Sequence, residues 1–340
     1  MTIIKYCIYI LIIIIIIIIL LNIHTAIIKY KNKTIEVFND IELPFKLNSS
    51  NLFIEDSYNL MSKIDDIYWK FMNHSNILAR GYLKLDEMVD QYRKNSLQNI
   101  TNEEKKYIIN NIELNVKTFI YTNQKIYNYL KYWCSQIKIA KSSKWLESGM
   151  PHTHNNIIIL NESAFNSSFQ FSTFLHEIIH IHQRKYPQDW NELILSLRFQ
   201  NYNFLDNPSS GLENILLRNR TNPDGLDINY LWCDPITNKH YWIGTIYSTI
   251  IPVSLINDMQ YIACHMQIDN AGMYKYTGTM INLNNFNNFN NFFGITNNNY
   301  HPNEIIAEYI NIYIGNYNYN NYDGYKLFKI YIDDFILAKY

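Results

Sequence analysis

The run His176-Glu177-Ile178-Ile179-His180 constrains local folding more than any other feature of this chain. On an α-helix, residues four apart lie about 40° from each other around the axis, so both imidazoles share one face. Ser172 or Thr173 can cap such a helix at its start, and Pro187 requires it to end near Tyr186. We therefore predict a helix that presents two histidines to one point.

This spacing is typical of a zinc site. Imidazole nitrogens are common Zn²⁺ ligands, and Glu177 is placed to act as a general base on water without binding the metal itself. His182 follows His176 by six residues and points about 120° away, so we interpret it as a non-ligand. The structural alternative is a pair of histidines on a helix face with no metal.

A second sequence pattern, near the C-terminus, contributes two acidic residues that could take part in the same site. Pro302 can open a helix that runs to about Ile314, where Gly315 stops it, and on this helix Glu304 and Glu308 share one face. One carboxylate could bind zinc, and the other could accept the free ring N–H of a ligating histidine. Two solvated acids on a surface helix are the structural alternative.

HExxH followed by Asn-Glu-x-x-Ala-Glu resembles the gluzincin zinc peptidases, the group that contains thermolysin. The resemblance implies that His176, His180 and Glu304 bind Zn²⁺, that Glu177 is the catalytic base, and that Glu308 orients a ligand. It also implies an α+β, zincin-like fold, mostly helical with a small sheet beside the active-site helix. The strand before that helix, at residues 155–160, is similar to the edge strand that pairs with substrate in that group.

The N-terminus suggests a membrane anchor. Residues 6–21 are uninterrupted apolar sequence, long enough with their continuation to span a bilayer, and we favour an uncleaved transmembrane helix over a signal peptide. Lysines flank it on both sides, which leaves the orientation open. The chain also resembles uncharacterised HExxH proteins of large DNA viruses, so a single-pass protein of a host or virion membrane is expected. A formal net charge of -1 excludes a nucleic-acid partner.

Composition shifts and turn residues predict the division of the chain. The expected parts are a transmembrane anchor (1–28), an extended juxtamembrane segment (29–55), a helical subdomain (56–150), a zincin-like catalytic domain (151–340) and, inside it, an Asn/Phe-rich surface insertion (282–299).

Several elements are predicted individually. Thr101 and Glu104 form a capping box for a helical stretch through about Ile139, and Pro187 can open a helix through about Phe199. A β-hairpin is expected from residues 228–233 and 240–247. Arg220 to Asp224 precedes this hairpin and could line the cleft, but we favour its interpretation as a plain turn.

Together these patterns predict a membrane-anchored zinc peptidase that acts on a peptide or protein substrate. The alternative is a catalytically inactive, zincin-like membrane protein with a structural or interaction role. The donor that would stabilise an oxyanion stays open among four residues: His301, Tyr309, Tyr230 and Tyr276.

Overall fold

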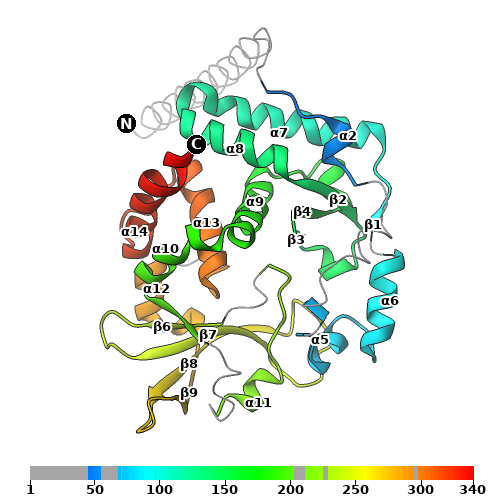
Figure 1. The fold of residues 1–340 in the computed structure, drawn as a ribbon. Helices are drawn as coiled ribbons and strands as arrows, with labels where there is room; N and C mark the ends of the chain where they lie inside the picture. The colour runs from blue at the N-terminus through cyan, green and yellow to red at the C-terminus, as the bar shows by residue number, and fades with distance from the viewer. Residues whose placement is uncertain are drawn as a thin grey trace, which may run out of the picture. The chain divides into compact units, whose positions relative to one another are not determined.

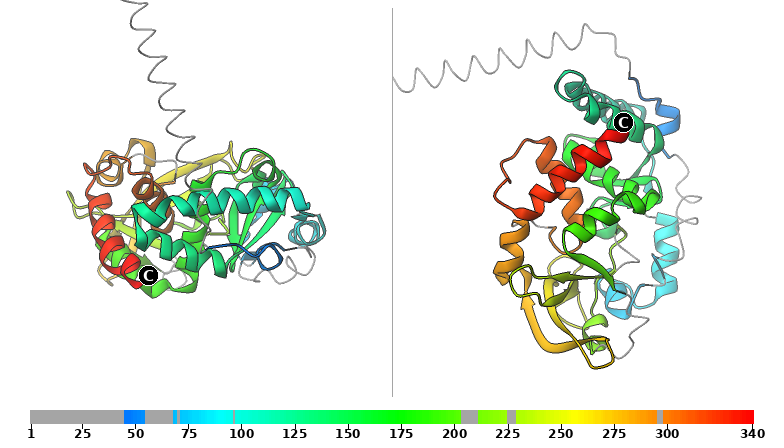
Figure 2. Two further views of the ribbon diagram at one scale, coloured as in Figure 1. Left: turned by 90° about the horizontal axis from the view of Figure 1, so that it is seen from above. Right: turned by 60° about the vertical axis from the view of Figure 1, so that its left-hand side comes forward.

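The computed structural model describes most of the chain beyond residue 44. The described residues are 45–54, 68–69, 71–95, 97–202, 211–224, 229–294 and 298–340. Leu47–Tyr340 forms one compact unit. The unit that begins at Leu47 contains all the named helices and strands (Figures 1 and 2).

Helices dominate the first part of this unit. They are α2 (Ser49–Leu52), α5 (His74–Ala79), α6 (Leu85–Asn95), α7 (Asn102–Thr122) and α8 (Gln124–Gln136). The predicted capping box of Thr101 and Glu104 is confirmed at the start of α7. The expected helical stretch is present as far as Gln136, but it consists of two helices, because Asn123 leaves the helical conformation and its side chain caps α8.

A four-stranded sheet comes next in the chain, in the order β1-β2-β4-β3. Its strands are β1 (Leu97–Gln98), β2 (Lys138–Ser142), β3 (His152–His154) and β4 (Ile157–Asn161). β4 pairs with β2 in parallel and with β3 antiparallel. The predicted strand therefore exists but is not an edge strand, which fits its nearly continuous burial; β3 is the edge.

The helix with the two histidines is α9 (Phe171–Lys185), which packs against β3 and β4 and ends before Tyr186 as predicted. Its N-cap is Gln170, so Ser172 and Thr173 lie inside its first turn. Beyond it come a 3₁₀ turn, Pro187–Asp189, and the short helix α10 (Asn191–Ser196). Phe199 opens a strand, so the helix predicted to reach it is too long.

A five-stranded antiparallel sheet lies at the opposite end of this unit from α7 and α8 (Figures 1 and 2). Its strands, paired in sequence order, are β5 (Phe199–Tyr202), β6 (Asn229–Cys233), β7 (His240–Tyr247), β8 (Met259–Ile268) and β9 (Tyr274–Asn282). β6 and β7 confirm the predicted hairpin. The short helix α11 (Glu213–Leu216) packs on this sheet, where Ile215 joins a core with Trp242 and Ile246.

The Asn/Phe-rich segment is not a surface loop. It forms a 3₁₀ turn, Leu283–Asn285, and the helix α12 (Asn287–Phe293), whose phenylalanines Phe289, Phe292 and Phe293 are buried. Residues 295–297 lie outside the described residues. The chain then continues into α13 (Pro302–Ile314), which ends at Gly315 as predicted, and α14 (Asp323–Tyr331).

The predicted fold class needs correction. The fold is mixed α and β, with about 50% helix and 20% strand, and it has two sheets where one small sheet was expected. Three strands of the five-stranded sheet, β5, β8 and β9, were not predicted, because their sequences do not show the regular alternation of a half-buried strand. β9, for example, is an edge strand whose residues are all partly or fully exposed, so its sequence carries little periodic signal.

The predicted single-pass membrane topology is also corrected. Within the described part of the chain, no helix is both long enough and apolar enough to cross a bilayer. The longest, α7, has 21 residues but carries charges throughout, including Glu104, Glu113 and Lys117. The predicted anchor at residues 1–28 lies outside the described residues.

Candidate metal centre

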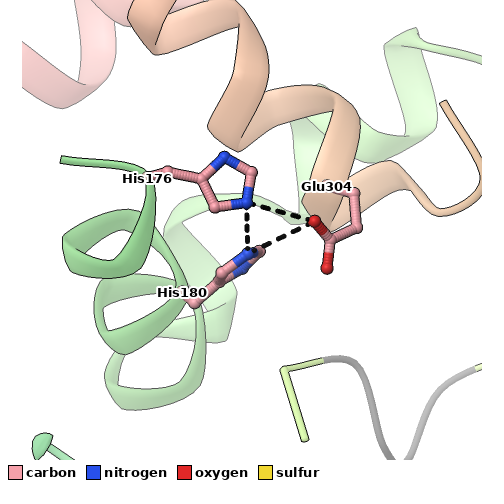
Figure 3. Close-up of side chains that lie close together, drawn as sticks. All are labelled: His176, His180 and Glu304. Atoms are coloured by element: carbon pink, nitrogen blue, oxygen red, sulfur yellow. Dashed lines mark hydrogen bonds and ion pairs between the residues drawn. The ribbon is translucent and has the colours of Figure 1, made fainter. Parts of the chain in front are cut away.

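Two helices that are distant in sequence bring three metal-binding side chains together. α13 packs against α9, and Glu304 in its first turn faces His176 and His180 (Figure 3). Nε2 of His176 lies 3.0 Å from Nε2 of His180 and 3.1 Å from Oε2 of Glu304. Nε2 of His180 lies 3.5 Å from the same carboxylate oxygen. The three predicted ligands therefore converge on one point.

These separations are compatible with the binding of one metal ion. Ligand atoms about 2.0–2.1 Å from a tetrahedral ion lie about 3.3–3.4 Å from one another. The three edges of the triangle, 3.0, 3.1 and 3.5 Å, bracket that value. Two imidazole nitrogens and one carboxylate oxygen also form a ligand set that leaves a fourth position open. The cluster could hold a metal ion without rearrangement of the backbone.

Gln183 fixes the orientation of His180. Its Nε2 donates to the carbonyl of Asn303 at 3.0 Å, which turns Oε1 toward Nδ1 of His180 at 2.9 Å. Since an amide oxygen can only accept, Nδ1 carries the proton and Nε2 is the atom left for a metal. The same amide joins α9 to the start of α13. Sequence reasoning missed this residue.

Asn222 fixes the orientation of Glu304. Its Nδ2 donates to Oε1 of Glu304 at 2.9 Å and also to the hydroxyl of Tyr300 at 2.9 Å. Oε2 of Glu304 is therefore the oxygen turned toward the imidazoles. Because the Tyr300 oxygen accepts from Asn222, the hydroxyl proton remains for another acceptor, and no described residue is bonded to it.

Glu177 lies on the same helix, is buried, and lines the same cavity as His176 and Glu304. Its Oε2 has no hydrogen-bond partner among the described residues. Burial raises the pKa of Glu177 well above its ordinary value, and the nearby Asp224 carboxylate adds to the effect. A buried carboxylate oxygen without a protein partner is a group that can receive a proton from a molecule in the cavity.

The protonation states of His180 and Glu304 depend on each other. Burial works against a charged His180, but Glu304 and Asp224 outweigh it and raise the pKa of His180 to about 10. Burial likewise opposes the charge of Glu304, yet His180 and His176 hold its pKa well below its usual range. Without a metal, the site thus favours a proton on an imidazole beside an ionised carboxylate. A cation would replace that proton.

The cavity has a volume of about 470 Å³. Besides His176, Glu177 and Glu304, its walls include Arg220, Asn222 and Asp224, from the segment interpreted from sequence as a plain turn. The alternative that this segment lines the cleft is therefore the one that the structure supports, with Asn222 bonded to Glu304 and Asp224 bonded to Thr153 of β3. Met259, Tyr261 and Tyr300 line another part of the wall.

Asp224 occupies part of the edge of β3. Its Oδ1 accepts hydrogen bonds from the backbone N–H and the hydroxyl of Thr153, at 2.9 and 2.5 Å. Arg184 of α9 donates to the same hydroxyl. An extended peptide that added to this edge would therefore meet a side chain at Thr153, while the cavity wall next to it is formed by Met150, Pro151 and His152.

Two predictions concern residues outside the triangle. Glu308 lines the cavity, but none of the hydrogen bonds and ion pairs of the described residues joins it to an imidazole. The interpretation of His182 as a non-ligand agrees with the structure. The His182 ring is buried between Trp133 and Trp190, with Nδ1 beside the Tyr129 hydroxyl and Nε2 beside Asp189.

The four oxyanion candidates do not line the cavity. Tyr309 donates to the Phe293 carbonyl at 2.8 Å. His301 caps α13 and packs edge-on against Tyr230, and Tyr276 packs on the core of the five-stranded sheet. Tyr300, one residue before His301, lines the cavity, as do Tyr261 and Tyr317, and none of the three was predicted from the sequence.

Comparisons with protein-family models, curated proteins and solved structures found no match to this chain.

Proposed function

We propose that this chain is a zinc-dependent peptidase. The observation that carries the proposal is the convergence of two imidazole nitrogens and one carboxylate oxygen beside a buried, unpartnered carboxylate oxygen of Glu177. These are the groups that hydrolysis of a peptide bond by a metal-assisted route needs. The resemblance of the two helical motifs to gluzincins supports the same function.

Each residue has a defined part. His176, His180 and Glu304 hold the ion, while Gln183 and Asn222 keep the donor atoms of His180 and Glu304 pointed at it. When bound, zinc supplies Lewis acidity toward the scissile carbonyl and lowers the pKa of water. Glu177 accepts the proton of the attacking water and delivers it to the leaving amine.

The oxyanion that develops at the scissile carbonyl needs a hydrogen-bond donor. The Tyr300 hydroxyl is suited to this part because Asn222 satisfies its oxygen and leaves its proton available. It lines the cavity together with Glu177 and Glu304. The donor and the base therefore belong to different elements, one on the segment before α13 and one on α9.

The test combines metal analysis with peptide digestion on the full-length chain. We expect about one zinc per chain in wild type, cleavage of a peptide library, and loss of about 10²–10⁴ of the rate in Glu177→Gln with zinc retained. Glu304→Gln should lose zinc. Glu308→Gln changes another cavity carboxylate of α13 and is the matched control. It should keep both the bound zinc and the wild-type rate of peptide cleavage.

Two outcomes would contradict the proposal. Zinc binding without cleavage of any peptide in the library would point to the inactive, zincin-like alternative. Absence of stoichiometric zinc in a folded wild-type protein, with no recovery on adding zinc, would mean that the two histidines and the glutamate serve only the packing of α9 against α13.

A further inference from the structure

Arg220 lies in the same cavity as the metal cluster but takes no part in it. Its backbone N–H donates to the carbonyl of Thr245 at 2.8 Å, which fixes this residue beside β7. The side chain lines the cavity and is only 9% exposed. Burial works to lower the pKa of Arg220, but Tyr300 and Glu147 outweigh it, so the guanidinium stays charged.

This guanidinium has no carboxylate partner among the described residues. Its Nε is buried without a hydrogen bond, and the contact recorded for Nη2 is the thioether sulfur of Met150 at 4.0 Å. Arg80 nearby provides the contrast, since two of its nitrogens donate to Glu147 at 2.9 and 2.7 Å. A buried charge without a partner is costly, so an anion from outside the chain would find strong attraction here.

Three of the acids that line the cavity are already engaged with other side chains. Glu147 accepts from Arg80, Tyr68 and Tyr92. Asp224 holds the backbone and hydroxyl of Thr153, and Glu304 faces the imidazoles and Asn222. None of these carboxylates forms an ion pair with Arg220 in the described part of the chain.

We propose that Arg220 recognises a carboxylate of the peptide substrate, as a specificity residue beside the metal cluster. The planar guanidinium fits a carboxylate through paired N–H bonds. The inference rests on the proposed peptidase function. The carboxylate could be the C-terminus of the peptide, which would make the enzyme a carboxypeptidase, or an acidic side chain, which would make it selective for Asp or Glu.

Equilibrium binding tests this without relying on turnover. The zinc-loaded Glu177→Gln variant would be titrated with acetylated pentapeptides of alanine with a central phenylalanine. One has a free C-terminus, one a C-terminal amide, and a set of amides carries a glutamate at each position in turn. We expect the free acid or one glutamate peptide to bind at least about tenfold more tightly than the plain amide.

Arg220 variants in the same background identify the residue responsible. Arg220→Gln should abolish the preference, and Arg220→Lys should retain part of it because the charge remains without the paired geometry. Arg218→Gln is the matched control, since Arg218 lies on the same segment and donates to the carbonyls of Tyr247 and Ser248, not into the cavity. It should keep the full preference.

A purely structural Arg220 predicts different results. Because Arg220 has no carboxylate partner within the described chain, Arg220→Gln should not lower the melting temperature, whereas a structural role would lower it and leave the carboxylate preference intact. Equal binding of acid and amide peptides, or an unchanged preference in Arg220→Gln, overturns the proposal.

The two proposals fail separately. Cleavage of peptides irrespective of their carboxylates refutes the role of Arg220 while the peptidase function stands. A carboxylate preference that depends on Arg220 but is accompanied by no cleavage refutes the peptidase and leaves a carboxylate-binding cavity.

Discussion

The tautomer of His180 depends on a single amide. Gln183 accepts from Nδ1 while donating to the Asn303 carbonyl, so Gln183→Leu removes both interactions. We expect zinc affinity to fall about 10- to 100-fold, as is typical for loss of a partner of a metal-bound imidazole. Competition with a chromophoric chelator measures this. Gln183→Glu still offers an acceptor and should lose less; equal losses in both variants would assign Gln183 to helix packing alone.

The hydroxyl of Tyr300 can be tested apart from its ring. Tyr300→Phe keeps the stacked pair with Tyr261, whose ring centroid is 5.0 Å away. It removes the hydroxyl, which is the proposed donor and also an acceptor for Asn222, while the hydrogen bond from Asn222 to Glu304 remains. We expect kcat to fall by about 10²–10³ with zinc content unchanged. Tyr261→Phe, which removes the neighbouring hydroxyl, is the control for the stack. A change in KM alone for Tyr300→Phe would place the hydroxyl in substrate binding and not in stabilising the oxyanion.

Local spacing identified the site only in part. The histidines, Glu177 and Glu304 follow from positions four apart on helices, and Gln183 could have been found because it lies three residues after His180 on the same helix. Asn222, Tyr300 and Arg220 carry no such signal. They reach the cavity through loops whose course depends on the five-stranded sheet, and in a chain rich in asparagine and tyrosine neither residue type stands out.

At the scale of elements, α12 provides a clear test of buried packing. Phe289 is fully buried against Trp232 and Phe293, with ring centroids 5.0 and 4.6 Å away. Phe289→Ala should lower the free energy of unfolding by about 3–5 kcal/mol. Asn291→Ala, on the exposed face of the same helix, should change it by less than about 0.5 kcal/mol. Urea unfolding measures both, and similar small effects would restore the surface-loop interpretation.

Helix boundaries were predictable where proline or glycine marks them. α13 begins at Pro302 and stops at Gly315, and α9 stops before Pro187. Prediction failed where a polar side chain makes the boundary, as when Asn123 separates α7 from α8. It also failed for the Asn/Phe segment, because buried phenylalanines at positions 289, 292 and 293 follow helical spacing that the repeated asparagines obscure.

At the scale of the whole unit, a buried polar network ties the helical part to the cavity. Arg80, which follows α5, donates to Glu147 beside the four-stranded sheet, and its Nη2 also reaches the Thr221 carbonyl. Asn76 of α5 donates to the Asn219 carbonyl and accepts from the Thr221 N–H. These hydrogen bonds fix the backbone of the segment that carries Arg220 and Asn222. Substitutions that remove them should therefore shift these two side chains in the cavity wall.

The ion pair in this network makes stability depend on pH. Both side chains are almost fully buried. Burial alone would raise the pKa of Glu147, but Arg80 outweighs it and lowers the pKa from 4.5 to about 2. Since the folded pKa is depressed, the stabilisation is complete above the unfolded pKa and is lost as pH falls toward 2. The shift corresponds to a contribution on the order of 3 kcal/mol near neutral pH.

Urea unfolding of zinc-free protein at pH 7, 5 and 3 measures this contribution. Glu147→Gln should be less stable than wild type by several kcal/mol at pH 7, partly because Arg80 is left unpaired. The gap should stay constant to about pH 5 and narrow at pH 3, where the unfolded wild type binds a proton that the folded one resists. The double variant Arg80→Met/Glu147→Gln removes both charges and should recover part of the loss at pH 7. A gap that is the same at pH 7 and pH 3 would mean that Glu147 is not held ionised by Arg80, and the network would then owe its strength to the hydrogen bonds of Tyr68 and Tyr92 alone.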